Sequence, residues 1–399
     1  MKKLSIKNFA LAGKRLLMRV DFNIPLDENQ NITDDKRIKA SLPTIQYAVE
    51  QGARVILMSH LGRPKGKIVP EMSLRPAAVR LGALLGKEVL FAPDCIGDAV
   101  EKIVSTMKDG DVLLLENVRF HKEETDNDAE FSKRLARLGD VYANDAFGSA
   151  HRAHASTVGI TQYFKTCLSG FLMEKELDYL GAAVTDPKRP FVAILGGAKI
   201  GDKIPVIENL LGKVDRLLIG GGMMFTFLAA QNRKIGRSLL DEESVNFVRQ
   251  LINDHPNQIV LPVDCLVTDS FDFGARTLGK TKVVSVDDIP DGWTGVDIGP
   301  GTISLFSETC GDAKTIVWNG PMGVFEIAAS AKGTMAVARL LADLTRKGAT
   351  TIIGGGDSAS AVKKAGVAAE VSHVSTGGGA SLEFLEGKEL PGVTVLTDA

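Results

Sequence analysis

The chain has 399 residues, of which 44% are hydrophobic and 24% charged, so it has the composition of a soluble globular protein and the length of two or three domains. This composition excludes a disordered chain, a collagen and a disulfide-stapled miniprotein. The 47 lysines and arginines nearly balance the 49 aspartates and glutamates, which gives no electrostatic reason to expect a nucleic acid or an anionic membrane as partner.

Short β-branched or leucine-rich runs alternate with helix-length segments along the chain, which indicates an α/β fold with parallel sheets flanked by helices. Continuous apolar runs such as Val112–Leu115 suit strands that are buried on both faces. We predict eleven strands, at residues 15–22, 54–60, 89–93, 111–117, 141–147, 191–197, 216–222, 258–267, 315–320, 350–356 and 371–375. This number is too large for one comfortable open sheet, so we expect two sheets in two domains.

The junction between the two domains is predicted at a helix that is followed by two prolines. Residues 172–184 have the pattern of a helix, and Pro187 and Pro190 then end it and introduce the strand at Phe191. We therefore expect a first domain at residues 1–171, a hinge helix and linker at 172–189, and a second domain at 190–384.

The cysteines and the N-terminus favour a cytoplasmic protein. The four cysteines lie at least 45 positions apart, which argues against a zinc site and a disulfide framework and fits a reducing compartment. Lys7 and Lys14 limit the N-terminal apolar run to a length too short for a signal peptide, and the uncharged stretch Leu217–Asn232 is too short to span a membrane.

Arginines follow several strands of the first domain, at the edge where open parallel sheets bind ligands. Four of them come after different strands, the first in the loop behind the first strand: Arg37, Arg63, Arg119 and Arg152. The guanidinium fork matches phosphate or carboxylate bidentately. Together with His60 and His154, these side chains predict a pocket for an anionic small molecule rather than four unrelated surface charges. A metal site at His151 and His154 lacks a nearby third ligand.

Glycine clusters follow strands of the second domain. They lie at residues 196–197, 220–222, 354–356 and 377–379. Glycine between a strand and a helix lets backbone N–H groups approach a phosphate, so four clusters predict a nucleotide site, although any single cluster could merely permit a tight turn. Lys199 and Lys203 are four positions apart, which would place them on one face of a helix after Gly197. Asp357 directly follows three glycines, where a carboxylate can hold a phosphate-bound Mg²⁺.

One apparent nucleotide motif is rejected. Residues 274–281 (GARTLGKT) match the P-loop pattern, which works only between a strand and a helix. The following residues alternate like a strand and then turn at Asp287–Gly292, so Lys280 has no helix N-terminus beside it. We therefore interpret the match as a hairpin that arose by chance.

Nine motifs resemble those of phosphoglycerate kinase. They lie at residues 20–25, 60–64, 115–120, 150–154, 196–203, 220–227, 318–326, 355–358 and 375–381, in order and over essentially the whole chain. The resemblance implies two Rossmann-like domains joined by a helical hinge, with the C-terminal tail, about residues 385–399, packing back on the first domain. It also implies reversible phosphoryl transfer from 1,3-bisphosphoglycerate to ADP, giving 3-phosphoglycerate and ATP, with Mg²⁺ and in a monomer.

The resemblance also assigns site residues. The first domain would bind phosphoglycerate through Asp21, Phe22, Asn23, Arg37, His60, Leu61, Gly62, Arg63, Arg119 and Arg152. The second would bind the nucleotide through Gly196, Lys199, Lys203, Gly220, Gly221, Asn319, Glu326, Gly355, Gly356, Asp357 and Ser358, with Asp357 as the metal ligand. The catalytic residues would be Arg37, Lys199 and Gly356. Two departures are noted: Ser358 replaces a more usual threonine, and Gly301 stands where bacterial relatives often carry lysine.

Two other classes of function were weighed. A Rossmann dehydrogenase needs G-x-G-x-x-G after its first strand and an acidic residue about 20 positions later, and none of the glycine clusters has that context. A non-catalytic nucleotide-binding scaffold would not require four arginines at strand ends. Direct in-line transfer needs positioning and charge neutralisation more than a nucleophile, so we expect closure of the two domains about the hinge.

Overall fold

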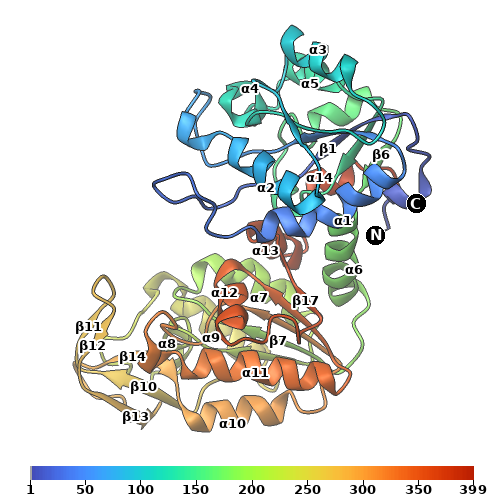
Figure 1. Cartoon of the computed structure of the whole chain (residues 1–399). Helices are drawn as coiled ribbons and strands as arrows, with labels where there is room; N and C mark the ends of the chain where they lie inside the picture. Colours follow the sequence, from blue (N-terminus) through green and yellow to red (C-terminus); the bar gives the residue numbers. More distant parts are fainter. Residues whose placement is uncertain (1) are drawn as a thin grey trace. The chain divides into compact units, whose positions relative to one another are not determined.

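The computed structural model describes residues 2–399, which fall into two compact units (Figure 1). Unit 1 comprises the chain up to Asp178 together with Glu389–Ala399, and unit 2 comprises Tyr179–Lys388. No helix in residues 2–399 combines the length and the apolar character that a membrane span requires.

Unit 1 is built on a six-stranded parallel sheet. In spatial order the strands are β3 (Leu90–Phe91), β4 (Val112–Leu114), β2 (Arg54–Met58), β1 (Arg15–Arg19), β5 (Val141–Asn144) and β6 (Cys167–Ser169). Alternate residues of the central strands, such as Leu16 and Val55, pack in the main apolar core with α1 (Lys36–Glu50) and α2 (Arg75–Leu85). The other helices are η1 (Ile6–Asn8), η2 (Pro70–Met72), α3 (Asp98–Thr106), η3 (Val118–Phe120), α4 (Lys122–Thr125), α5 (Ala129–Ala136), η4 (Phe147–Ser149) and η5 (Gly159–Tyr163).

Unit 2 contains a second six-stranded parallel sheet. Its strands, in spatial order, are β17 (His373–Val374), β16 (Thr350–Gly354), β15 (Thr315–Asn319), β7 (Phe191–Leu195), β8 (Arg216–Ile219) and β9 (Ile259–Val260). Its helices are η6 (Gly201–Lys203), α7 (Ile204–Leu211), α8 (Met224–Ala230), η7 (Glu242–Ser244), α9 (Val245–Asp254), α10 (Pro300–Thr309), η8 (Ala328–Ser330), α11 (Lys332–Arg346), α12 (Gly356–Lys364) and α13 (Gly379–Leu385). The expectation of two parallel sheets flanked by helices is confirmed.

Unit 2 also contains antiparallel strands, which the expectation of parallel sheets alone omitted. The predicted strand 258–267 is two strands, β9 and β10 (Asp264–Thr268), because Pro262 lacks the N–H that a continuous ladder would need. The second of these pairs on either side with β13 (Thr281–Ser285) and β14 (Thr294–Ile298) in a separate sheet. A hairpin of β11 (Phe271–Asp272) and β12 (Thr277–Leu278) stands beside it.

A single helix carries the chain from unit 1 into unit 2. The predicted helix at 172–184 is α6 (Phe171–Thr185), and the division between the units falls inside it, after Asp178. Asp145 of unit 1 accepts hydrogen bonds from the Leu172 and Met173 N–H groups, at 2.9 and 3.2 Å, so its carboxylate caps the N-terminus of this helix.

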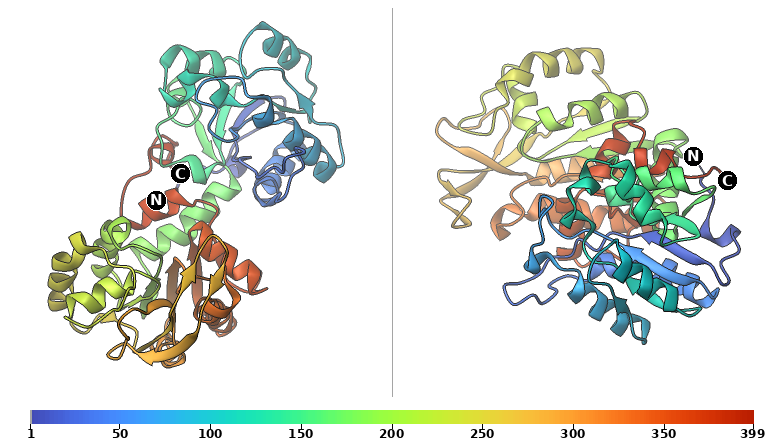
Figure 2. Two further views of the ribbon diagram at one scale, coloured as in Figure 1. Left: turned by 90° about the vertical axis from the view of Figure 1, so that its left-hand side faces the viewer. Right: turned by 90° about the horizontal axis from the view of Figure 1, so that it is seen from above.

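The C-terminal segment forms part of unit 1. Its helix α14 (Pro391–Thr394) lies between Leu390 and Leu396, both of which are buried. The Asn144 amide at the end of β5 donates to the Gly392 carbonyl at 3.1 Å, and the Lys3 ammonium contacts the Asp398 carboxylate at 2.7 Å. The segments next to the two chain ends therefore lie side by side (Figure 2).

We expect the C-terminal segment to contribute directly to the stability of unit 1. Leu390 is 1% exposed, so Leu390→Ala should lower the free energy of unfolding by about 2–5 kcal/mol, the usual cost of a large-to-small change in a core. Val79 is 71% exposed, and Val79→Ala should change the free energy of unfolding by less than about 0.5 kcal/mol. Urea unfolding of both variants checks this, and equal, small effects would contradict it.

Candidate functional site

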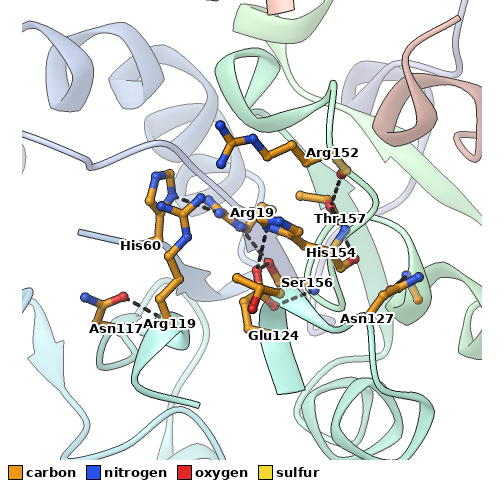
Figure 3. A network of polar contacts seen from close by, with 12 residues as sticks. Arg19, His60, Asn117, Arg119, Glu124, Asn127, Arg152, His154, Ser156 and Thr157 are labelled. Carbon is orange, nitrogen blue, oxygen red and sulfur yellow. Dashed lines mark hydrogen bonds and ion pairs between the residues drawn. The ribbon is translucent and has the colours of Figure 1, made fainter. Parts of the chain in front are cut away.

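A group of buried cationic side chains gathers at the carboxyl edge of the sheet in unit 1 (Figure 3). Arg19, the last residue of β1, is fully buried, and its guanidinium is held at three points. Its Nε donates to the Ser156 hydroxyl at 2.8 Å, its Nη2 lies 3.0 Å from His60 Nδ1, and its Nη1 donates to the Val20 carbonyl. The side chain at the end of β1 thus places a positive charge beside His60, which follows β2.

A buried carboxylate faces this group. Glu124 of α4 is completely buried, and its two oxygens accept from the Ser156 N–H at 2.9 Å and the Ser156 hydroxyl at 2.6 Å. Its backbone carbonyl also accepts from the Ala155 N–H at 2.9 Å. These hydrogen bonds to Glu124 therefore hold in place the loop after β5 that carries Arg152 and His154.

Two buried nitrogen atoms of the group have no hydrogen-bond partner among residues 2–399, Arg119 Nε and His154 Nδ1. Arg119 is 8% exposed, follows β4 in η3, and donates from Nη1 to the Gly62 carbonyl at 2.9 Å. A buried polar atom without a partner is costly unless a ligand supplies one. An anion placed against Arg119 would satisfy its Nε and lower the repulsion among the cations.

The ionisation of these groups reflects burial and mutual repulsion. Burial, then the charges of Arg19 and Arg152, lower the pKa of Arg119 to about 10. Burial, then Arg119 and Arg19, lower the pKa of His154 to about 4. The pKa of His60 is also well below its usual value, because of burial first and then the charges of Arg19 and Arg119. Both imidazoles are therefore neutral at pH 7, and the arginines alone carry the charge.

The loop after β1 supplies a second part of the site. Asp21 is buried and pairs with Arg37. Its carboxylate also accepts from the Asn23 N–H at 3.1 Å, and the Asn23 side-chain oxygen accepts from the Gly62 N–H at 2.9 Å. The loop after β1 is thus fastened to the loop after β2.

Arg37 was expected in a loop, and that expectation is wrong. It lies in the first turn of α1, which starts at Lys36 because the Asp34 side chain accepts from the Lys36 N–H at 3.0 Å. The helix leaves the Arg37 side chain about a third exposed and within reach of Asp21.

The remaining predicted residues of unit 1 differ in their exposure. The side chains of Phe22 and Leu61 are buried in the apolar core, so their backbone atoms alone are available to a ligand. Arg63 and Arg152 are exposed, and Arg152 Nε donates to His151 Nε2 at 3.1 Å. The structure thus brings His60 and Arg119 together with Asp21, Asn23 and Gly62.

Unit 2 has a cavity of about 490 Å³ at the carboxyl ends of its strands. Eight of the residues predicted for the nucleotide line it: Gly196, Lys199, Lys203, Asn319, Gly355, Gly356, Asp357 and Ser358. Lys203 donates to the Asn319 side-chain oxygen, and burial lowers the pKa of Lys203. The Ser358 hydroxyl accepts from the Gly320 N–H at 2.7 Å, which orders the glycine loop.

The predicted helix after Gly197 does not begin where expected. Lys199 lies in the loop before η6, and α7 begins only at Ile204, with Pro205 in its first turn, where proline is preferred because its missing N–H costs no bond within the helix. Lys199 and Lys203 therefore reach the cavity from a loop and a 3₁₀ turn, not from one helix face.

A second cavity of about 710 Å³ adjoins the first, sharing Gly197, Ala198, Pro321 and Asp357 with it. It includes the predicted Gly221 and Glu326, but most of its wall is apolar: Met224, Phe225, Leu239, Phe271, Phe273, Val296 and Met322. Sequence patterns missed this wall, because apolar residues at strand and helix ends look like core. Gly220 is absent from both linings, and a Cβ there would lie 2.5 Å from the Met322 sulfur, so the Met322 side chain would have to move to admit one.

The hairpin interpretation of the false P-loop is confirmed. Residues 274–276 lie in the turn between β11 and β12, residues 277–278 form β12, and Thr281 begins β13, so a strand rather than a helix follows the motif. The Lys280 N–H donates to the Asp269 carboxylate at 2.8 Å, as expected of a turn. Phe271 of the same hairpin, however, lines the apolar cavity.

Arg19, Glu124 and Ser156 are the polar residues that the sequence analysis missed in unit 1. Arg19 could have been identified from the sequence. Arg19 is a charged residue inside a strand whose neighbours Met18 and Val20 are apolar, and buried arginine is rare without partners.

Comparisons with known proteins agree on one family. The family model described as phosphoglycerate kinase matches residues 6–388. The chain is 57% identical to the phosphoglycerate kinase of Chloroherpeton thalassium, with 100% of both chains covered. It is 56% identical to a wheat (Triticum aestivum) protein named "Phosphoglycerate kinase, cytosolic", with 98% of this chain and 96% of the relative covered. The structure of phosphoglycerate kinase from Coxiella burnetii matches with a TM-score of 0.88 at 41% identity, over 98% of both chains.

We expect the buried histidine of the cationic group to make folding sensitive to acid. The pKa of His154 is about 4 in the folded protein and about 6.5 when unfolded, so the unfolded chain binds the extra proton between these values. Stability should therefore fall as the pH drops from about 6.5 to about 4, by up to about 3 kcal/mol from this residue. His154→Gln should flatten the pH dependence of urea unfolding over this window; an unchanged slope would contradict the assignment.

Proposed function

The chain belongs to the phosphoglycerate kinase family, and we propose how its two units share the family's reaction. Its activity is that of a glycolytic phosphotransferase with a carboxyl group as acceptor. The reaction we propose in detail is reversible transfer of the acyl phosphate of 1,3-bisphosphoglycerate to MgADP, giving 3-phosphoglycerate and ATP.

Unit 1 binds the phosphoglycerate. The observation that carries this proposal is the buried Arg119 guanidinium, whose Nε has no partner among residues 2–399, beside the buried Arg19. A phosphoglycerate carries a carboxyl and a phosphate group, so it can accept from several guanidinium donors at once. Arg37, Arg63 and Arg152, each at least partly exposed, can close around it.

Unit 2 binds the nucleotide. The glycine-lined cavity with Lys199 and Lys203 suits phosphates, because backbone N–H groups and ammonium groups both donate there. The adjoining apolar cavity suits a purine base, since ligand pockets are mostly apolar with a few placed polar groups. The two cavities meet at Pro321 and Asp357, as a single extended ligand would require.

Asp357 would hold the Mg²⁺ that accompanies the nucleotide. Its carboxylate supplies the oxygen ligand that Mg²⁺ prefers, it is exposed, and it lines both cavities. When bound, the metal neutralises charge on the phosphates. The adjacent Lys203 is partly buried, and Asp357 is among the acidic groups that favour its charged form.

Direct in-line transfer is the mechanism we propose. Arg37 of unit 1, and Lys199 with the Gly356 N–H of unit 2, would stabilise charge on the transferring phosphoryl group, because such transfers depend on positioning and charge neutralisation. Both substrates must meet, so closure about α6 would precede the chemistry. We propose a monomeric, cytoplasmic enzyme, which agrees with four cysteines that are all free and buried.

The purified protein should form ATP from ADP and 1,3-bisphosphoglycerate in a coupled assay, which a mere nucleotide-binding scaffold would not do. Arg37→Ala should lower kcat by about 100-fold or more while raising KM far less, since the interaction is made mainly in the transition state. Lys36→Ala removes a charge from the same turn of α1 and serves as control, with changes below about twofold. An Arg37→Ala enzyme with near-normal kcat would remove Arg37 from the catalytic role.

Two lysines distinguish the proposed nucleotide site from the false P-loop. Lys203 lines the glycine cavity, so Lys203→Ala should weaken ADP binding by at least about 1 kcal/mol. Lys280 is exposed in the hairpin, and Lys280→Ala should change ADP affinity less than twofold, about 0.4 kcal/mol. Calorimetric titration of both variants with ADP checks this. A larger effect at Lys280 would mean that the nucleotide is placed wrongly.

A further inference from the structure

A continuous line of buried polar groups runs from a carboxylate to a histidine in unit 1 (Figure 3). It passes from Glu124 through the Ser156 hydroxyl and the Arg19 guanidinium to His60, over contacts of 2.6, 2.8 and 3.0 Å. Glu124, Ser156 and Arg19 are fully buried, and His60 is 5% exposed. The proposed function gives no role to Glu124 or Ser156.

The protons along the line have only one arrangement. A guanidinium has donors and no acceptor, so Arg19 Nε donates to Ser156 Oγ and Arg19 Nη2 donates to His60 Nδ1. The Ser156 hydroxyl keeps its own hydrogen for Glu124 Oε1. Because His60 Nδ1 must accept, it carries no proton, and the ring's single N–H lies on Nε2.

We propose that Glu124 and Ser156 are positioning residues that, through Arg19, fix His60 as the neutral imidazole protonated on Nε2. His60 then offers one directed N–H to an oxygen of the phosphoglycerate and adds no charge to the site. The identity of that ligand rests on the proposed function, whereas the tautomer follows from the contacts alone.

The charges around His60 explain why a fixed neutral ring is needed. Four groups from separate elements crowd it: Arg19 on β1, Arg37 on α1, Arg119 on η3 and His154 in the loop after β5. Asp21 and Glu124 are the carboxylates near these cations. The Glu124 carboxylate accepts from Ser156, and its Oε1 also lies 3.8 Å from His154 Nδ1. A second proton on His60 would have to displace Arg19, and burial with the neighbouring arginines lowers the pKa of His60 further.

The tautomer can be measured in the wild-type protein without any ligand. With ¹⁵N-labelled histidine, long-range proton–nitrogen spectra distinguish a protonated from an unprotonated ring nitrogen, and loss of one set of signals in His60→Gln assigns this residue. We expect Nε2 protonated and Nδ1 unprotonated at pH 7. A proton on Nδ1, or on both nitrogens at pH 7, would overturn the proposal.

Two variants test the positioning role. Ser156→Ala removes the hydroxyl that links Glu124 to Arg19, and Glu124→Gln removes the charge with little change of shape. Each should raise KM for 3-phosphoglycerate about tenfold, the effect of one lost charge-assisted hydrogen bond, and leave KM for MgATP within twofold. In both, the His60 signals should move toward a mixture of the two tautomers.

A matched control comes from the same unit. Ser132 on α5 is also fully buried, and its hydroxyl donates to the Asp128 carbonyl at 2.7 Å, outside the line. Ser132→Ala should leave both KM values and the His60 signals unchanged. Unchanged His60 signals and an unchanged KM for 3-phosphoglycerate in Ser156→Ala and Glu124→Gln would contradict the proposal.

The experiments distinguish a failure of this proposal from a failure of the proposed function. If the wild-type protein did not phosphorylate 3-phosphoglycerate, the function would fail, yet the tautomer of free His60 could still be measured. If it was active with His60 protonated on Nδ1, the function would stand and the positioning role would fall. If a variant does not fold, the wild-type spectrum still tests the predicted tautomer of His60.

Discussion

Burying several positive charges side by side costs free energy, and the polar contacts of unit 1 at the carboxyl edge of its sheet lower that cost. Arg19 and Arg119 are buried at this edge of the sheet, where each lowers the pKa of His60 and of His154. Glu124 offsets part of the repulsion, and its pairing with Ser156 also orders the loop after β5. The remaining excess of charge is what an anionic substrate would relieve, so the stability of the free protein and its affinity for the ligand oppose each other.

The same sheet geometry produces two unlike sites. In unit 1 the loops at the carboxyl ends of the strands carry long donors such as Arg119, while in unit 2 they carry glycines, so that the backbone itself lines the cavity. A Cβ on Gly196 would lie 2.1 Å from the Pro321 carbonyl oxygen, and one on Gly221 would lie 2.5 Å from the Gly197 nitrogen. These loops are packed against one another too closely for any side chain.

Features that depend on the local sequence pattern were predicted correctly. All eleven predicted segments contain a strand, the clusters of glycine follow strands, and residues 274–281 form a hairpin. What it missed depends on contacts between distant segments: β10 pairs with β13 and β14, and Phe271 reaches a cavity from an exposed hairpin. Arg19 was passed over because a strand pattern records only that its neighbours are apolar, whereas its partners Ser156 and His60 lie far along the chain.

We propose that the phosphoglycerate binds at the buried guanidinium of Arg119 and its neighbours. A crystal structure of the protein with 3-phosphoglycerate tests it most directly. We expect ligand oxygens within hydrogen-bond distance of Arg119 Nε and of His60 Nε2. A well-defined ligand elsewhere, with Arg119 Nε still unpaired, would contradict it.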